Sequence, residues 1–381
     1  MKNTFIKFFI TGILFFFSIS VFATNYPVTL KDVSGRTVTI DHKPKNIALA
    51  YSRGFPILEI LYGNEAGKHV VAWGGDMKAG TPGQYDYFIK KYPNLKNIPE
   101  LGYINSGGFN TEKFIEMKNK PDILIVDQTL VKTGEETGIF DVLQKAGIPV
   151  ISYDFYSNPV KNTVKSIETI GIALDREKEA EAFKKIYDTH LKNILTKIKK
   201  HGKESNKKTV FIERAAGIGN SSLRTYGDAD MGTFIPLLSA QNVMTNSHVG
   251  NNFITTLPET VISLQPDIYI MQTSSWKDEK GHSRGQGVPL GYPPVNMKDV
   301  KKEQATLLNR TWFNAINAKN TNNVHSIWMN LHNSPYNIIA IEYFAKWIYP
   351  NLFKSLDPNK TFQDINSISH NTMIGNPLFV V

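Results

Sequence analysis

The feature that most constrains the fold of this chain is a pattern that occurs once in each half. In the first half, an amphipathic segment beginning at Glu112 leads through a Pro-Asp turn into the apolar run 123–126. In the second half, a segment beginning at Glu259 leads through another Pro-Asp turn into the apolar run 268–271. Because the order and the apolar pattern agree, the repeat predicts two lobes of similar architecture, for which 381 residues suffice.

Each lobe is predicted to be an α/β unit. Short apolar runs with little polar interruption alternate with amphipathic segments, which is typical of parallel strands covered on both faces. The predicted strands are 46–50, 69–73, 122–126, 149–153, 209–213 and 267–271, and the predicted helices are 56–62, 111–118, 140–145, 231–238, 259–264 and 336–349. A hairpin over 28–40 precedes them. The predicted fold class is α/β, with two lobes that each consist of a mainly parallel sheet flanked by helices.

The middle of the chain is predicted to join the lobes as a single long helix. From Pro159 to Lys200 the only glycine is Gly171, and apolar residues recur at helical spacing. Asp175-Arg176 marks the point at which this helix would divide into two helices in line. The predicted boundaries are a signal peptide at 1–23, an N-terminal lobe at 24–157, the inter-lobe helix at 158–201 and a C-terminal lobe at 202–381.

The first residues predict export. Lys2 and Lys7 precede a mostly apolar run, and small or apolar residues at 21–23 suit a signal peptidase, so cleavage is expected after Ala23. An uncleaved membrane anchor is the alternative, but the apolar run is short for a membrane span. The chain has no cysteine, so it carries neither a disulfide nor a lipid-modified N-terminal cysteine. A periplasmic location is predicted, and export argues against a nucleic-acid partner despite the net charge of +9.

Several ordered motifs resemble those of a known family. They are the opening segment DVSGRTVTI at 32–40, the two repeat segments, GIPV at 147–150, and YFAKW at 343–347 followed by YPNLF at 349–353. Together they resemble the substrate-binding proteins of ATP-binding-cassette importers for iron–siderophore complexes, haem and cobalamin. The resemblance implies a cleft between two lobes, a rigid helical connection, no catalysis and a monomeric protein. It also implies that Glu112 and Glu259 dock on the dimeric inner-membrane permease.

Candidate ligand-binding residues are those that follow the predicted strands, because ligands of open α/β sheets lie beyond the carboxyl ends of the strands. They are Tyr51, Arg53, Trp73, Gln128, Arg214, Arg224, Tyr226, Trp276, Arg284 and Trp328. Only seven of the 43 basic residues are arginines, and four of those seven are in this set. The planar guanidinium matches carboxylate or catecholate oxygens, which favours an anionic ligand. The alternatives are ion pairs for the arginines and core packing for the aromatic residues.

A metal is expected to arrive as part of the ligand. The predicted ligand is a ferric siderophore, with iron(III) as a chelate and no intrinsic cofactor; haem, cobalamin and a metal with a small metallophore are the alternatives. The nine histidines form no metal-binding pattern, and His325 is the candidate to touch a bound metal. An exported enzyme is a further alternative, but the sequence lacks a Gly-x-Ser-x-Gly elbow, a phosphate loop and a zinc-hydrolase motif. No catalytic residues are predicted.

Overall fold

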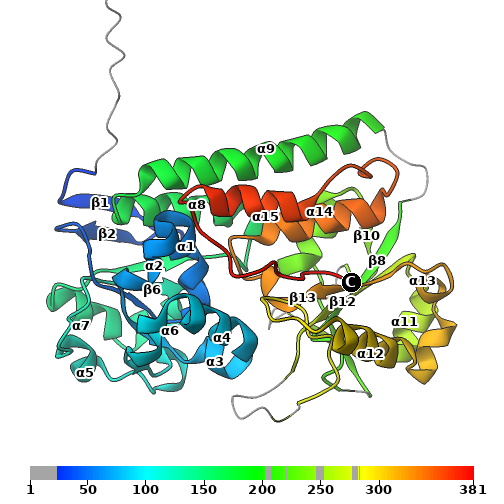
Figure 1. Ribbon diagram of the computed structural model, residues 1–381, viewed down its shortest axis with the longest axis horizontal. Helices are drawn as coiled ribbons and strands as arrows, with labels where there is room; N and C mark the ends of the chain where they lie inside the picture. Colours follow the sequence, from blue (N-terminus) through cyan, green and yellow to red (C-terminus); the bar gives the residue numbers. More distant parts are fainter. Residues whose placement is uncertain (1–23, 202–206, 220, 246–252, 277–281, 283) are drawn as a thin grey trace, which may run out of the picture.

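The computed structural model describes residues 24–201, 207–219, 221–245, 253–276, 282 and 284–381. Two α/β lobes lie side by side, and the helix α9 (Glu177–His201) runs along one side of both (Figure 1). The two predicted sheets are confirmed as separate sheets, one in each lobe. Within the part of the chain that is described, none of the helices combines the length and the apolarity needed to cross a membrane.

The N-terminal lobe contains a five-stranded parallel sheet in the order β5-β4-β3-β6-β7. Its strands are β3 (Ile47–Leu49), β4 (Val70–Gly74), β5 (Glu100–Leu101), β6 (Ile123–Asp127) and β7 (Val150–Tyr153). Its helices are α1 (Phe55–Tyr62), α2 (Ala66–His69), α3 (Asp76–Gly80), α4 (Pro82–Lys91), α5 (Thr111–Ile115), α6 (Val131–Glu136) and α7 (Ile139–Lys145). The predicted hairpin is confirmed as the antiparallel pair β1 (Val28–Lys31) and β2 (Thr37–Ile40).

Burial on both faces explains the continuous apolar runs. In β6, Ile123 and Ile125 belong to one apolar cluster, whereas Leu124 and Val126 belong to another on the opposite face. The first cluster continues through α9 into the C-terminal lobe. The lobes therefore have separate sheets and share apolar packing along their helical side.

The C-terminal lobe contains a mixed sheet in the order β11-β9-β8-β12-β13, with β10 beside β8. Its strands are β8 (Thr209–Arg214), β9 (Leu223–Thr225), β10 (Gln241–Asn242), β11 (Ile254–Thr256), β12 (Ile268–Thr273) and β13 (Val324–Trp328). Its helices are α10 (Phe234–Leu237), α11 (Pro258–Leu264), α12 (Met297–Leu308), α13 (Asn317–Asn320), α14 (Asn337–Ile348) and α15 (Pro358–Ser367). The short strands β9 and β11 pair antiparallel and were not predicted, because three residues carry little periodic signal.

The predicted connection by a single long helix is present as α9, but its predicted start at residue 158 is wrong. The chain forms α8 (Pro159–Ala173), turns at Asp175 with a left-handed φ of 55°, and returns as α9. The helices lie antiparallel, since Gly171 of α8 faces Ala180 of α9 and Glu168 lies 4.0 Å from Lys184. Of these two helices, α9 is the one that runs along both lobes (Figure 1).

The C-terminal segment 368–381 connects the lobes a second time. Its first part lies against the N-terminal lobe, where Asn371 accepts a hydrogen bond from Lys91 and the Ile374 amide donates to Tyr87 at 3.1 Å. Its last part pairs with the C-terminal lobe through the bridges Gly291–Leu378 and Ile327–Val380. We call residues 368–381 the strap.

Candidate ligand-binding cleft

Residues from both lobes line a cavity beside the carboxyl ends of β3 and β4. Its volume is about 380 Å³. The N-terminal lobe contributes the predicted residues Tyr51 and Arg53, and the C-terminal lobe contributes the predicted residue Arg284. The other lining residues are Asp76, Ala79, Gly80, Tyr103, Asn105 and Ser106. Three of the predicted ligand-binding residues, taken from both lobes, therefore meet at one cavity.

Asp76 fixes the position of Arg53. This buried carboxylate accepts hydrogen bonds from the Ser52 amide at 2.6 Å, the Ser52 hydroxyl at 2.9 Å and Arg53 Nε at 2.7 Å. Burial lowers the pKa of Arg53 and the Asp76 carboxylate raises it, with a net rise. Burial, with Asp127 and Asp76 nearby, raises the pKa of Tyr51 to about 12. Sequence reasoning missed Asp76, because it took the strand to end at Trp73, whereas β4 continues to Gly74.

Arg214 and Arg224 form a cationic pair at the carboxyl end of β8. They are opposite each other in the β8–β9 ladder, and their guanidinium carbons lie 4.7 and 5.4 Å from the centroid of the Phe253 ring. Neither arginine lines the cavity, and neither has an ion pair with any described residue. Arg214 Nε is buried without a hydrogen-bond partner among those residues.

The acidic residue next to this pair is already neutralised. Glu213 accepts two hydrogen bonds from Arg310, at 2.6 and 2.7 Å, and a third from the Tyr269 hydroxyl at 2.8 Å. Arg284 also lacks an ion pair with the residues that the structure describes. Three arginines of the C-terminal lobe therefore present positive charge that no described carboxylate balances.

The lobes also touch through residues outside the predicted ligand-binding set. The Asn333 amide of the C-terminal lobe donates to Asp127 at 3.5 Å, at the carboxyl end of β6. His332 lies 2.5 Å from the buried Asp230, and its ring lies 5.5 Å from that of Tyr156 in the other lobe. Burial raises the pKa of Asp127. The sequence places Asp127 and Tyr156 after strands, but it does not show their partners in the other lobe, because these depend on how the lobes are joined.

Three predicted aromatic residues are placed in the core instead of on a cavity wall. Trp73 is 3% exposed and packs against Phe55, and Trp328 is 3% exposed and stacks on Phe379. Tyr226 is fully buried, with its hydroxyl donating to Gln272 at 2.7 Å. These placements correct the expectation of aromatic walls, because both tryptophans lie within strands and not beyond them.

Gln128 and Trp276 are engaged in contacts within their own lobes. Gln128 accepts a hydrogen bond from Ser34, in the turn of the N-terminal hairpin. Trp276 donates from Nε1 to the Ala216 carbonyl at 2.6 Å and has a left-handed φ of 40°. Neither residue lines the inter-lobe cavity.

The structure does not place His325 where a metal in the cleft would lie. His325 is the second residue of β13, whereas the cleft adjoins the carboxyl ends of the strands. Its ring stacks on Trp347 at 4.4 Å, and burial lowers its pKa to about 4. Across the described residues, no group of three or more His, Cys, Asp or Glu side chains could hold a metal ion.

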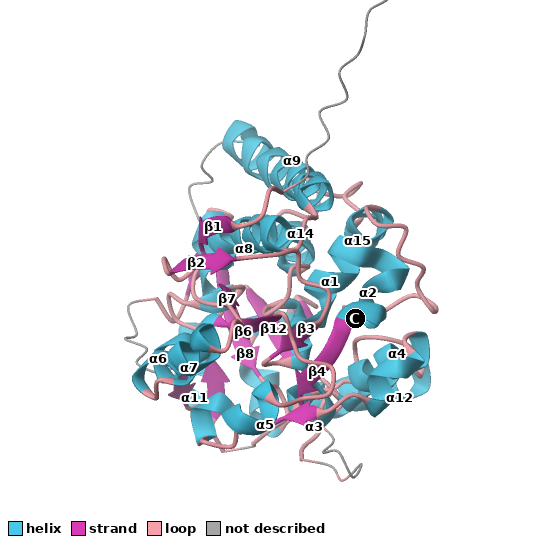
Figure 2. Ribbon diagram, turned by 90° about the vertical axis from the view of Figure 1, so that its left-hand side faces the viewer, coloured by secondary structure: helices cyan, strands magenta, loops and turns pink. Residues whose placement is uncertain are grey.

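Glu112 and Glu259 occupy equivalent places. Each is exposed in the first turn of a short helix, α5 or α11, at the side of the molecule away from α9 (Figures 1 and 2). Neither has an ion pair with another described residue. The two carboxylates are therefore available to a partner that approaches this side.

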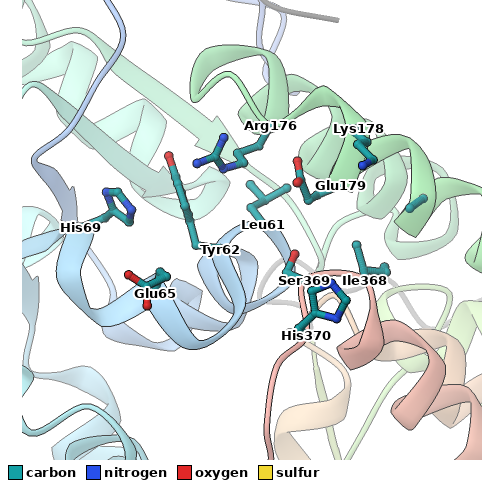
Figure 3. A pocket seen from close by; sticks show the side chains of 11 residues that line it. Leu61, Tyr62, Glu65, His69, Arg176, Lys178, Glu179, Ile368, Ser369 and His370 are labelled. Atoms are coloured by element: carbon teal, nitrogen blue, oxygen red, sulfur yellow. The ribbon is translucent and has the colours of Figure 1, made fainter. Parts of the chain in front are cut away.

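A second cavity, of about 530 Å³, lies away from the strand ends (Figure 3). It is lined by α1, α2, the beginning of α9 and the start of the strap. Tyr62 lies between the His69 ring, at 4.0 Å, and the Arg176 guanidinium, at 4.5 Å. Of these two cavities among the described residues, the first adjoins the strand ends and is lined by side chains of both lobes, so it is the candidate ligand site.

Comparison with known proteins agrees with this architecture. The family model of periplasmic binding proteins matches residues 65–324. YvrC, an ABC transporter substrate-binding lipoprotein of Bacillus subtilis, is 26% identical over 332 residues, which cover 86% of this chain and 88% of YvrC.

Two solved structures show the same fold. The TroA-like periplasmic binding protein FepB from Veillonella parvula superposes with a TM-score of 0.82 at 22% identity, over 93% of this chain and 99% of FepB. The molybdate-bound MolA of Haemophilus influenzae superposes with a TM-score of 0.65 at 15% identity, over 92% of this chain and 99% of MolA. Since the family model covers more than half of the sequence, this chain belongs to the periplasmic binding protein family.

Proposed function

We propose that this chain captures an anionic metal chelate between its lobes and delivers it to an ABC importer. A ferric siderophore is the leading candidate. The observation that carries the proposal is a set of three arginines that lack ion pairs with the described residues: Arg214 and Arg224, paired at the carboxyl end of β8, and Arg284, on the wall of the inter-lobe cavity. Family membership supports a binding role, and no catalytic role is proposed.

An anionic ligand would relieve the repulsion between these cations. Arg214 and Arg224 are held against one phenyl ring, so their charges cannot separate without losing that packing. Guanidinium groups donate paired hydrogen bonds to catecholate, carboxylate or oxyanion oxygens. Iron(III) would arrive already bound by the oxygen atoms of the chelator. The proposal therefore needs no protein side chain to coordinate the metal.

Titration calorimetry on the mature protein tests the ligand class. The panel consists of a ferric catecholate, a ferric hydroxamate, hemin, cobalamin and molybdate. Each charge-assisted hydrogen bond contributes about 1.5–3 kcal/mol, so Arg284→Gln is expected to weaken binding of the anionic chelate by roughly 10-fold or more. The exposed Lys298→Gln is the control. If cobalamin is the only compound of the panel that binds, and Arg284→Gln leaves its affinity unchanged, the proposal of an anionic ligand is wrong.

The proposed docking contact is formed by Glu112 and Glu259. Two carboxylates, one on each lobe, would set the orientation of the protein on a two-fold symmetric permease. Reversing both charges, Glu112→Lys with Glu259→Lys, is expected to abolish uptake of the ligand by cells while calorimetry shows unchanged affinity. Glu136→Lys, also exposed, is the control. Normal uptake by the double variant would contradict the docking role.

The protein is proposed to act as a monomer in the periplasm after removal of residues 1–23. The apolar run and the residues before Thr24 support processing at this point.

A further inference from the structure

The first described residues are attached to the turn between α8 and α9. The Thr24 backbone nitrogen donates to Asp175 Oδ1 at 3.1 Å. The Thr24 hydroxyl donates to the Ile172 carbonyl at 3.1 Å and also contacts Glu177. The Tyr26 hydroxyl donates to the Ala173 carbonyl at 3.1 Å. Four contacts therefore hold residues 24–26 at the point where α9 begins.

The carboxylates of this turn are incompletely neutralised. Asp175 has one cationic partner, Lys43. Glu177 has no ion pair with the described residues, and its Oε2 is buried without a hydrogen-bond partner among them. Burial raises the pKa of Glu177, whereas the hydrogen bonds from Lys43 and the Thr24 amide outweigh burial and lower the pKa of Asp175. The turn therefore lacks one positive charge.

The neighbouring arginine does not supply this charge. Arg176 donates to the Asp175 carbonyl at 2.9 Å, and its guanidinium lies over the Tyr62 ring in the second cavity (Figure 3). It forms no ion pair with a carboxylate of the described residues. A cation that reached Asp175 and Glu177 would have to come from another part of the chain.

The predicted processing site lies directly before the residue that already touches both carboxylates. Hydrolysis of the Ala23–Thr24 amide bond consumes one water, leaves a carboxylate on Ala23 and leaves an amine on Thr24, which is protonated at neutral pH. We infer that processing after Ala23 creates an ammonium group on Thr24 that binds Asp175 and Glu177 and anchors the mature N-terminus to the start of α9.

The ammonium group suits this position better than the amide that it replaces. An amide nitrogen donates one hydrogen bond, and that bond already goes to Asp175. An ammonium group donates three, so Asp175 can keep its bond while Glu177 gains one. Lys43 and the ammonium group would then balance Asp175 and Glu177, while Arg176 and Glu179, which also act on this turn, carry opposite charges. The anchor ties the N-terminal hairpin to the helix that spans both lobes.

The test compares three forms of the full mature protein. One begins at Thr24, one retains Ala23 so that the ammonium is displaced by one residue, and one begins at an acetylated Thr24. The Thr24 form is expected to have the highest Tm at pH 7 and low salt, by about 2 °C or more. Glu177→Gln is expected to remove most of this difference. Glu181→Gln, an exposed acid further along α9, is the matched control and should preserve it.

The pH dependence gives a second readout. The carboxylates should raise the pKa of the Thr24 ammonium in the folded protein above its ordinary value of about 8. The pKa of the Thr24 ammonium is then higher in the folded than in the unfolded protein. The added stability is therefore complete at pH values below the pKa of the unfolded state, and it is lost as the pH rises through the pKa of the folded state. The Tm difference should therefore disappear in alkaline buffer.

Equal Tm values for the three forms, or equal effects of Glu177→Gln and Glu181→Gln, would overturn the inference. So would an intact mass showing that the exported protein begins at another residue. None of these measurements involves a ligand, so their outcome is independent of the proposed transport function.

Discussion

At the residue scale, one buried carboxylate decides which arginines of the C-terminal lobe are available to a ligand. Glu213 precedes Arg214 in the chain, but its side chain lies on the opposite face of β8 and binds Arg310. The Glu213 side chain is 3% exposed and the Arg310 side chain 11%. Burial lowers the pKa of Arg310, but the Glu213 carboxylate and the Tyr269 hydroxyl raise it overall. Arg310 is therefore structural, and Arg214 remains unpaired with respect to the described residues.

Removing Arg310 should destabilise the lobe because it leaves a buried charge. Arg310→Met is expected to lower the free energy of unfolding by about 3–5 kcal/mol, as measured by urea denaturation. The double variant Arg310→Met with Glu213→Gln should recover part of the loss, since the unpaired carboxylate is gone. Equal stability of the single variant and the exposed control Lys302→Gln would contradict the structural role.

Of the predicted ligand-binding residues, Arg53, Arg284 and Tyr51 line the cavity, whereas two of the predicted tryptophans lie in the core. Tyr51 and Arg53 follow β3 of the N-terminal lobe, whereas Arg284 lies in the loop after β12 of the other lobe, and the three line one cavity because the ends of both sheets face it. Trp73 and Trp328 are still within their strands, where successive side chains alternate between faces. An error of one residue in the end of a strand therefore moves an aromatic side chain from the cleft to the core.

At the element scale, two features let α8 and α9 pack antiparallel: the turn at Asp175 and the small residue Gly171 in α8. A Cβ atom on Gly171 would lie 2.5 Å from the Cβ of Ala180 in α9 and 3.1 Å from the Arg176 carbonyl. Helical periodicity alone could not reveal this reversal, because both helices carry the same 3.6-residue pattern and only three residues separate them. The length of the connecting helix was therefore overestimated, whereas its helical character was predicted correctly.

Gly171→Ala should force α8 and α9 apart. Overpacking at a close helix contact costs about 1–3 kcal/mol, so this loss of stability is expected despite the better helix propensity of alanine. Gly83→Ala in α4 is the matched control, because no atom lies within 4 Å of the added Cβ. The control should be neutral or slightly stabilising in thermal denaturation. A stabilising Gly171→Ala would show that the helices do not pack as closely as described.

At the scale of the whole molecule, three extended features of the described residues join the lobes. They are α9, the apolar cluster that the lobes share, and the strap (Figure 1). The strap could not be predicted, because residues 368–381 have no periodic pattern and their partners are distant in the sequence. A molecule held in this way should close on a ligand by a small rotation, since wide opening would have to break apolar packing.

The strap provides the test of this rigidity. Phe379 is 1% exposed and stacks on Trp328, and the backbone of the last residues pairs with β13. Truncation before Pro377 removes these contacts but leaves the part of the strap that binds the N-terminal lobe. Loss of the buried phenyl ring is expected to cost about 3–5 kcal/mol. Spin-label distances between the lobes should broaden, and amides of β13 should exchange faster while those of β3 change little. If the distance distribution stays as narrow as in the full chain, α9 and the shared apolar packing alone set the geometry of the cleft.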